Sequence, residues 1–172
     1  LLRRSADLAM GRTPYEPPEL TFPGLKGEIA YDPRQISEHG SKRLIRMGFE
    51  IAETRNGAPV DGKKRVSCID KSNVTRGCQL FRRTFEKVAQ NYPGTELDYG
   101  FIDAFTQWLT RSPESYDVVV TSNMFGDIAT DLGAVLQGGM GMAASGNIGD
   151  TNAFFEPVHG SAPKYAGMNK VN

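Results

Sequence analysis

The segment from Tyr116 to Gln137 constrains the fold of this chain more than any other. Residues 116–120 form a short run rich in β-branched valine, as expected of a strand buried in a parallel sheet. If residues 125–137 are helical, Asp127 and Asp131 share one face of the helix, because they are four positions apart. A strand leading into a helix is the unit of α/β folds, whose ligand crevices lie beyond the carboxyl ends of the strands.

The same alternation of strand and helix extends over most of the chain. From Ser37 the pattern of apolar residues predicts a helix to about Arg55, ended by Asn56-Gly-Ala-Pro59. Strands and helices then alternate, which predicts an α/β domain. The predicted strands are 65–69, 97–102 and 118–121, and the predicted helices are 77–91, 104–111 and 125–137.

Residues 1–35 differ in character from the rest. The five prolines in this stretch are too many for a helix. The runs 20–22 and 28–31, separated by Pro23-Gly-Leu-Lys-Gly27, predict a short hairpin or an arm. Because residues 13–35 carry more apolar surface than a free loop exposes, we expect them to pack on a second copy of the chain in a homodimer.

Charge and cysteine content restrict the class of protein. The chain has 20 basic and 20 acidic side chains, and a net charge of zero argues against electrostatic binding of nucleic acid. Cys68 and Cys78 are too few for a disulfide scaffold and are not spaced as a zinc ribbon, so we expect a reducing, cytoplasmic location. No apolar run approaches the roughly 20 residues of a membrane span.

Side chains suited to chemistry follow three successive predicted strands. Lys71 and Asn73 follow the first strand, Asp103 follows the second, and Asp127 and Asp131 follow the third. Anionic oxygens at such strand ends suit Mg²⁺ or Mn²⁺, which retain waters and accept further oxygens from a substrate. A lysine among acidic groups and a metal ion can accept a proton, because burial and nearby cations favour its neutral form.

Each of these residues also has an ordinary structural role open to it. Asp127 and Asp131 would then cap a helix or complement its dipole. Lys71 would be a solvated loop lysine paired with Asp70, and Asp103 would be a helix N-cap. Their joint recurrence after three strands favours the functional interpretation.

The segment from Phe155 to Gly167 has the composition of a ligand-binding loop. Gly160 and Ser161 offer backbone N–H groups and a hydroxyl to a phosphate or ribose, and His159 can stack on a flat ring or donate to a hydroxyl. The alternative is a structural histidine beside an ordinary glycine–serine turn.

Six short motifs follow one another along the chain. They are Asp70-Lys-Ser-Asn73, Ile102-Asp-Ala104, Asn123-Met-Phe-Gly-Asp-Ile-Ala-Thr-Asp131, Gly138-Gly-Met-Gly-Met142, Gly146-Asn-Ile-Gly-Asp150 and Glu156-Pro-Val-His-Gly-Ser-Ala-Pro163. In this order they resemble the isocitrate/isopropylmalate dehydrogenase family of metal-dependent, β-decarboxylating hydroxyacid dehydrogenases. The resemblance runs from about Ile36 to the end of the chain and is weaker over residues 1–35.

The resemblance implies a fold and a domain organisation. The fold would be α/β, of the isocitrate/isopropylmalate dehydrogenase type, and this chain would hold only part of it. Residues 1–35 would form the arm or clasp, and residues 36–150 the small domain for dimerisation and for metal and substrate binding. Residues 151–172 would begin the return to the large, dinucleotide-binding domain.

The resemblance also implies roles at the strand ends. Lys71 matches the lysine that assists proton removal from the substrate hydroxyl, and Asn73 matches the asparagine near nicotinamide and substrate. Asp103, Asp127 and Asp131 match the carboxylates around the metal ion. In family dimers, Lys71 and Asp103, the implied catalytic residues, reach a site that the other subunit completes.

The loop after residue 155 is implied to hold the adenosine half of a dinucleotide. Its matching residues are Glu156, His159, Gly160, Ser161, Ala162, Pro163, Lys164, Tyr165 and Asn172. Lys164-Tyr165 is similar to NADP-using isocitrate dehydrogenases. NAD-using members carry an acidic residue at the position of Lys164, which accepts a ribose 2′-OH and repels a 2′-phosphate. We therefore predict NADP, with NAD as the alternative.

The implied reaction is the oxidative decarboxylation of a small hydroxy di- or tricarboxylic acid with NADP and Mg²⁺ or Mn²⁺, with isocitrate going to 2-oxoglutarate as the first candidate. A 3-isopropylmalate, tartrate or homoisocitrate dehydrogenase using NAD is the alternative, because residues 62–65 and 68–74 look more like isopropylmalate enzymes. A non-catalytic dimerisation or regulatory paralogue is a further alternative. It has no chemical need for Lys71 together with three aspartates.

Parts of the family pattern are not recognisable in the chain. The arginine cluster that clamps substrate carboxylates, the early glycines of the dinucleotide domain and an acid-like tyrosine are absent, and Tyr15 and Tyr31 are poor substitutes by position. The chain also begins at Leu1 rather than at a methionine. We therefore expect a piece of a longer enzyme, roughly the middle half of a typical member, that is inactive by itself.

Overall fold

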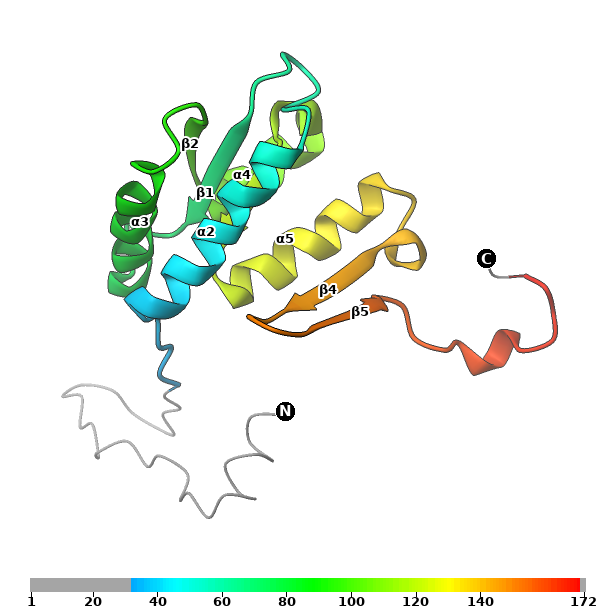
Figure 1. The fold of residues 1–172 in the computed structure, drawn as a ribbon. Helices are drawn as coiled ribbons and strands as arrows, with labels where there is room; N and C mark the ends of the chain where they lie inside the picture. The colour runs from blue at the N-terminus through cyan, green and yellow to red at the C-terminus, as the bar shows by residue number, and fades with distance from the viewer. Residues whose placement is uncertain (1–31, 171–172) are drawn as a thin grey trace. The chain divides into compact units, whose positions relative to one another are not determined.

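The computed structural model describes residues 32–170 of the chain. The predicted arm, apart from its last residues, and the predicted cofactor residue Asn172 lie outside the described residues. Residues 35–172 form one unit of the chain (Figure 1). Within residues 32–170, none of the helices combines the length and the apolar character that crossing a membrane requires.

A three-stranded parallel sheet forms the centre of this unit. β1 (Arg65–Asp70) lies between β2 (Glu96–Phe101) and β3 (Val118–Thr121). The helix α3 (Arg76–Ala89) connects β1 to β2, and α4 (Ile102–Arg111) connects β2 to β3. Because all three strands run the same way, their carboxyl ends meet at one edge of the sheet.

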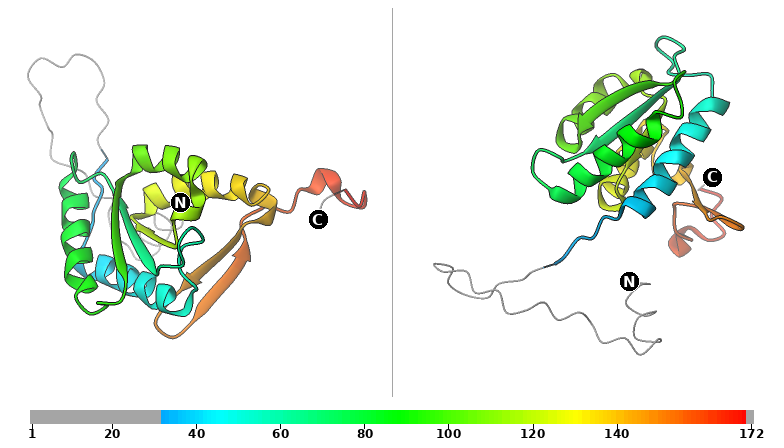
Figure 2. Two further views of the ribbon diagram at one scale, coloured as in Figure 1. Left: turned by 90° about the horizontal axis from the view of Figure 1, so that it is seen from above. Right: turned by 60° about the vertical axis from the view of Figure 1, so that its left-hand side comes forward.

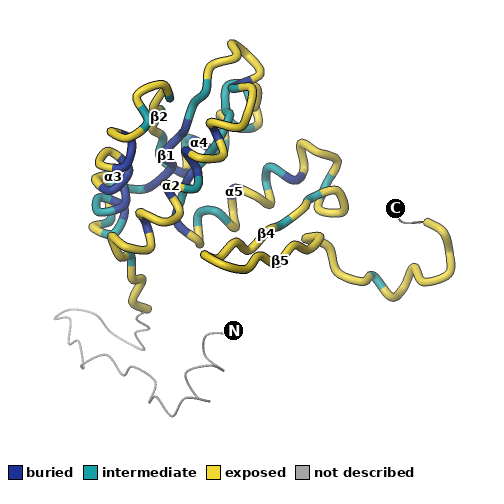
Figure 3. The backbone as a smooth tube through the Cα atoms, in the orientation of Figure 1, coloured by how far each residue is buried: buried dark blue, intermediate teal, exposed yellow. Residues whose placement is uncertain are grey.

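Helices cover both faces of the sheet (Figure 2). The helices α2 (Glu38–Thr54) and α3 pack on one face, and α4 and α5 (Asn123–Leu136) pack on the other. Successive residues of β1 alternate between the two cores, with Cys68 in the first and Ile69 in the second. Every residue of β1 after Arg65 is therefore buried (Figure 3).

The sheet has a topological switch point between β1 and β3. These strands are neighbours, but the helices that follow them, α3 and α5, pack on opposite faces. Ligands of open α/β sheets bind in the crevice that such a reversal leaves beyond the carboxyl ends of the strands. The topology therefore predicts a binding crevice where β1 and β3 end.

The core between α2, α3 and the sheet depends on a close approach of helix to strand. A Cβ atom added to Gly48 would lie 2.4 Å from Cγ1 of Val120, so only glycine allows α2 to approach β3 this closely. The next residue, Phe49, is fully buried and stacks on Phe85 and Tyr92, with ring centroids 5.4 and 4.8 Å apart.

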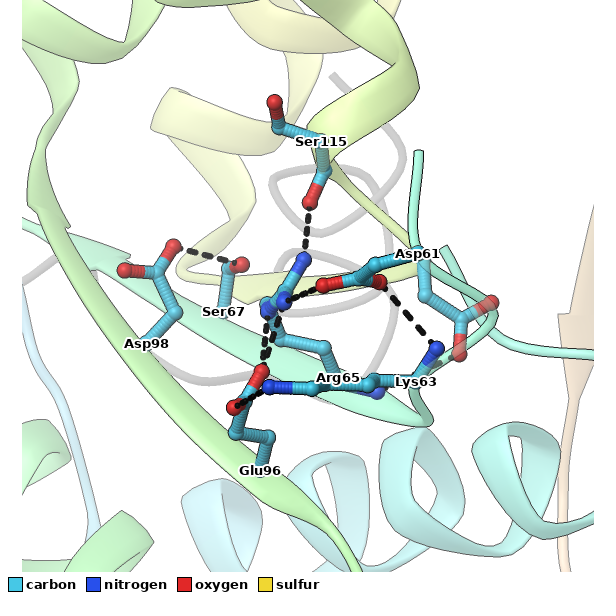
Figure 4. A network of polar contacts seen from close by, with 8 residues as sticks. Asp61, Lys63, Arg65, Ser67, Glu96, Asp98 and Ser115 are labelled. Atoms are coloured by element: carbon cyan, nitrogen blue, oxygen red, sulfur yellow. Dashed lines mark hydrogen bonds and ion pairs between the residues drawn. The ribbon is translucent and has the colours of Figure 1, made fainter. Parts of the chain in front are cut away.

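Charged side chains tie the amino ends of β1 and β2 together (Figure 4). Arg65 donates to Oε2 of Glu96 from Nε (2.8 Å) and Nη2 (2.6 Å), to Asp61 (2.7 Å) and to the carbonyl of Ser115 (2.7 Å). Lys63 donates to the other oxygen of Glu96 (3.0 Å). The hydrogen bonds from Lys63 and Arg65 lower the pKa of Glu96 below its usual range.

The helices and strands predicted between residues 37 and 137 are confirmed, with ends that differ by at most two residues, and so is the α/β fold class. The hairpin of β4 (Ala144–Ile148) and β5 (Ala153–Pro157) was not predicted. Its strands are short and mostly exposed, so they lack the apolar alternation that marks a strand in sequence. The predicted domain boundary at residue 150 falls in the turn between them and stays a prediction.

Between residues 32 and 170, three short 3₁₀ helices also lie outside the predicted elements. They are η1 (Pro113–Ser115), η2 (Met140–Met142) and η3 (Pro163–Tyr165). Each is three residues long, which is too short for an apolar period to be visible in the sequence.

Candidate functional site

Lys71 and Asn73 lie in the turn at the carboxyl end of β1, in the middle of the sheet edge. The turn is stabilised by hydrogen bonds from the backbone N–H groups of Val74 and Thr75 to the carbonyl of Lys71, each 3.0 Å long. The carboxylate of Asp70 accepts the backbone N–H of Ser72 at 2.9 Å, as short polar side chains often do in turns. The strand thus ends in a defined turn that holds Lys71 at the carboxyl edge of the sheet.

Lys71 forms an ion pair with Asp103, which follows the carboxyl end of β2. Its Nζ donates to Oδ1 of Asp103 and lies 5.7 Å from the ring centroid of Phe101. The hydrogen bond from Lys71 lowers the pKa of Asp103 below its usual range, so the carboxylate stays ionised near neutral pH. The structure therefore joins the two residues predicted to be catalytic.

The ordinary structural roles considered for these two residues, a Lys71–Asp70 pair and an Asp103 N-cap, are both wrong. Lys71 does not pair with Asp70, whose carboxylate instead binds Arg82. Asp103 is not the N-cap of α4, because that position belongs to Phe101 and Asp103 lies in the first turn. An aspartate in the first turn still interacts favourably with the helix dipole, but Asp103 also forms an ion pair with Lys71.

Asp127 and Asp131 lie one turn apart on α5, the helix that follows β3. Both side chains are exposed, and Nδ2 of Asn123 lies 3.4 Å from Oδ1 of Asp127. The cap position of α5 is Ser122, and its first turn contains no acidic residue. Capping and dipole effects are confined to the first turn, so they do not account for these two aspartates.

A single chain does not assemble the whole predicted metal site. Among residues 32–170, no three His, Cys, Asp or Glu side chains lie close enough together to hold a metal ion. Asp127 and Asp131 nevertheless fit Mg²⁺ or Mn²⁺, because such ions use one or two protein carboxylates and take their remaining oxygens from water and substrate. Asp103 of another subunit would be a third ligand, as predicted.

Two buried hydroxyl groups lie between β3 and α5, beside this crevice. Within the described part of the chain, Oγ1 of Thr121 and Oγ of Ser122 have no hydrogen-bond partner. Leaving a buried polar group unpaired costs roughly 1–3 kcal/mol. A ligand, a water molecule or a further protein group at this position would supply the missing hydrogen bonds.

The residues predicted to hold the dinucleotide lie on and after β5. Glu156 belongs to β5, and the stretch that follows is exposed except at Ala162, which is partly buried. Ala162 has a left-handed backbone (φ 44°) and leads into η3, where Nζ of Lys164 lies 4.8 Å from the ring centroid of Tyr165. Nδ1 of His159 lies 2.9 Å from the carbonyl oxygen of Gly160.

Three comparisons with known proteins bear on the site. The matching family model is described as isocitrate/isopropylmalate dehydrogenase and covers residues 15–172. A 3-isopropylmalate dehydrogenase of Clavibacter sepedonicus is 44% identical over 153 residues, which are 87% of this chain and 41% of that protein. An NADP isocitrate dehydrogenase of Thermus thermophilus is 43% identical over 145 residues, 84% of this chain and 28% of that protein.

A solved structure agrees with these relatives. The crystal structure of a beta-decarboxylating dehydrogenase from Thermococcus kodakarensis in its apo form has a TM-score of 0.74 and 38% sequence identity. The match covers 87% of this chain and 42% of that one. The chain thus spans less than half the length of these three proteins.

Proposed function

Because this chain belongs to the isocitrate/isopropylmalate dehydrogenase family, we propose that the complete protein oxidises and decarboxylates a 3-substituted malate with a nicotinamide dinucleotide and a divalent metal ion. The observation that carries the proposal is the Lys71–Asp103 pair at the carboxyl ends of adjacent parallel strands. A regulatory relative has no chemical need for an amine held by a carboxylate at a crevice edge.

Lys71 would take the proton of the substrate hydroxyl while hydride leaves the same carbon for nicotinamide. Asp103 would orient the Lys71 amine through the ion pair, and Asn73, in the same turn, would face the nicotinamide. Asp127 and Asp131 would hold Mg²⁺ or Mn²⁺. When bound, that ion makes the hydroxyl more acidic and stabilises negative charge as carbon dioxide leaves.

The proposed assembly is a homodimer with shared active sites, in which Lys71 and Asp103 of one subunit complete a site containing Asp127 and Asp131 of the other. Exposed apolar side chains on α4 and α5 support it: Trp108 is 51% exposed, Ile128 53% and Val135 66%. Apolar surface on two adjacent helices is typical of a face covered by a partner. The proposal includes no nucleic acid and no membrane partner.

The proposed cofactor is NADP and the first candidate substrate is isocitrate, because Lys164 and Tyr165 offer a cation and a phenol to a 2′-phosphate. A second candidate, 3-isopropylmalate with NAD, is favoured by the name of the relative from Clavibacter. Cys68 and Cys78 are both buried and form no disulfide in the described part of the chain, which fits the proposed cytoplasmic location.

Turnover by the complete purified protein tests the proposed function. We expect reduced nucleotide and carbon dioxide to form from isocitrate or 3-isopropylmalate with Mg²⁺ and NADP, and a chelator to abolish both. Lys71→Met should lower kcat on the order of 10²- to 10⁴-fold, since general acid–base catalysis contributes that much. Lys42→Met, at an exposed position on α2, is the matched control. A folded wild type that turns over no hydroxy acid of this class would favour the non-catalytic paralogue.

A further inference from the structure

An ion pair between the buried Asp70 and the partly buried Arg82 lies next to the Lys71 turn and has no role in the reaction proposed above. The carboxylate of Asp70 is 1% exposed and is bound at both oxygens by Arg82, from Nε at 2.8 Å and from Nη2 at 2.9 Å. The same carboxylate accepts the backbone N–H of Ser72. Asp70 therefore links α3, which carries Arg82, to the backbone of the turn that carries Lys71.

α3 holds the turn at a second point. Nε2 of Gln79 donates to the carbonyl of Ser72 at 3.0 Å. Ser72 thus has its N–H fixed through Asp70 and its C=O fixed by Gln79. Because Ser72 lies between Lys71 and Asn73, these hydrogen bonds from both sides of Ser72 also restrict the backbone of its two neighbours.

Arg82 and Lys71 also lie close to the same aromatic ring, that of Phe101. The guanidinium of Arg82 lies 5.4 Å from the ring centroid of Phe101 and 5.3 Å from that of Tyr99. The amine of Lys71 lies 5.7 Å from the same Phe101 ring. Contacts of cations with aromatic rings are directional, so the Phe101 ring is shared between the partly buried Arg82 and the lysine of the turn.

Stability alone is a weak reason for this pair. Removing the charge of Asp70 from water is costly, and well-packed apolar residues in place of a buried ion pair often make a protein equally or more stable. A bidentate arginine–carboxylate pair does supply a fixed geometry, because the planar fork allows little freedom. Because the pair lies next to the turn, its fixed geometry can hold the backbone of the turn in place.

We propose that Arg82 and Asp70 are positioning residues that fix the Lys71–Asn73 turn so that the Lys71 amine meets Asp103 and the substrate. The catalytic part of this inference rests on the proposed function. Its geometric part, the placement of Lys71, does not require turnover.

Arg82→Met in the complete protein is the direct test, and Arg83→Met is its matched control, because Arg83 is the next residue of α3 and is exposed. Since Arg82→Met leaves Asp70 charged and unpaired, it can unfold the protein. The double variant Asp70→Asn with Arg82→Met removes both charges and keeps the test decisive. For each variant we measure the melting temperature and kcat. We also measure how fast acetic anhydride labels Lys71, using peptide mass spectrometry, with Lys42 as the internal reference.

We expect the double variant to fold and to lose kcat about a hundredfold, as displacement of a catalytic group by about 1 Å does. Its Lys71 should be labelled faster than in the wild type, with Lys42 unchanged, and the KM for the dinucleotide should stay close to that of the wild type. Arg83→Met should match the wild type throughout. A folded double variant with wild-type kcat and wild-type labelling of Lys71 would overturn the proposal.

The labelling readout separates this inference from the proposed function. If the wild type turns over no hydroxy acid, the proposed function fails, and the labelling of Lys71 still decides whether Arg82 and Asp70 place it. Faster labelling in the double variant then supports the positioning role, and equal labelling contradicts it.

Discussion

Lys71 reaches Asp103 instead of its sequence neighbour Asp70 because Asp70 ends β1, whereas Asp103 lies in the first turn of α4, just after β2. Asp70 is the last residue of β1 and points into the buried layer, where Arg82 binds it. Lys71 begins the turn and extends along the sheet edge toward the end of β2. A lysine next to an aspartate in sequence is thus separated from it by the alternation of a strand.

The choice of dinucleotide is a prediction at this same scale. A contact of a 2′-phosphate with Lys164 and Tyr165 should contribute about 1.5–3 kcal/mol, a preference on the order of tenfold to a hundredfold. Lys164→Asp with Tyr165→Ile in the complete enzyme should lower kcat/KM with NADP by that factor and with NAD far less. Lys42→Asp, at an exposed position on α2, is the control. Equal loss with both cofactors, or a wild type that prefers NAD, would rule out the assignment.

Some residues of the site could be found in the sequence and others could not. Lys71, Asp103, Asp127 and Asp131 stand out because each follows a strand pattern. Asp70 and Arg82 were not predicted as a pair, because each stands beside another charged residue, Lys71 and Arg83, and so is not marked out as buried. Their 12-residue separation gives no local pattern from which the contact itself could be inferred.

At the scale of elements, the close approach of α2 to β3 leads to a prediction about the stability of the fold. Gly48→Ala should lower the free energy of unfolding by about 1–3 kcal/mol, because the new methyl group overlaps Val120. Gly94→Ala, where an added Cβ meets nothing within 4 Å, is the matched control and should change stability little. Urea denaturation of the complete protein measures both. Equal stability of the two variants would contradict the described contact.

The ion-pair network at the amino ends of β1 and β2 makes a prediction about pH. The lowered pKa of Glu96 means that its stabilising contribution is fully present above its unfolded pKa, near 4.3, and is lost as pH falls through the lower folded value. Glu96→Gln should therefore melt at a lower temperature than the wild type by a constant margin from pH 6 to 8, and the margin should shrink below about pH 4.

Glu114→Gln, at an exposed position in η1, is the control for this experiment and should follow the wild type at every pH. A margin between Glu96→Gln and the wild type that widens toward low pH would contradict the sign of the shift. So would a margin that does not change with pH.

Elements that bury one face were predictable, and the rest were not. The three parallel strands and their helices carry apolar periods because each contributes to one of the two cores. β4 and β5 contribute to neither core, and Phe154 and Phe155 are 60% and 70% exposed. Without a buried face, a strand leaves no alternation to read, so its pairing became visible only in the structure.

At the scale of the whole molecule, the site is divided within the chain. Lys71 and Asp103 form one pair and Asp127 and Asp131 another, and among the described residues no third carboxylate joins the second pair. Two half-sites on one chain become complete sites when two copies exchange them across a two-fold axis. That arrangement is the central claim of the proposed function.

Purified mixed dimers of Lys71→Met and Asp127→Asn subunits test this claim most directly. The two variants are co-expressed with different tags, and each variant alone should be nearly inactive. In the mixed dimer one site contains both substitutions and the other contains neither, so we expect about half of the wild-type kcat. The mixed dimer of wild type and Lys71→Met should also retain about half and serves as the control. A doubly substituted mixed dimer as inactive as its parents would show that Lys71 and Asp127 act within one chain.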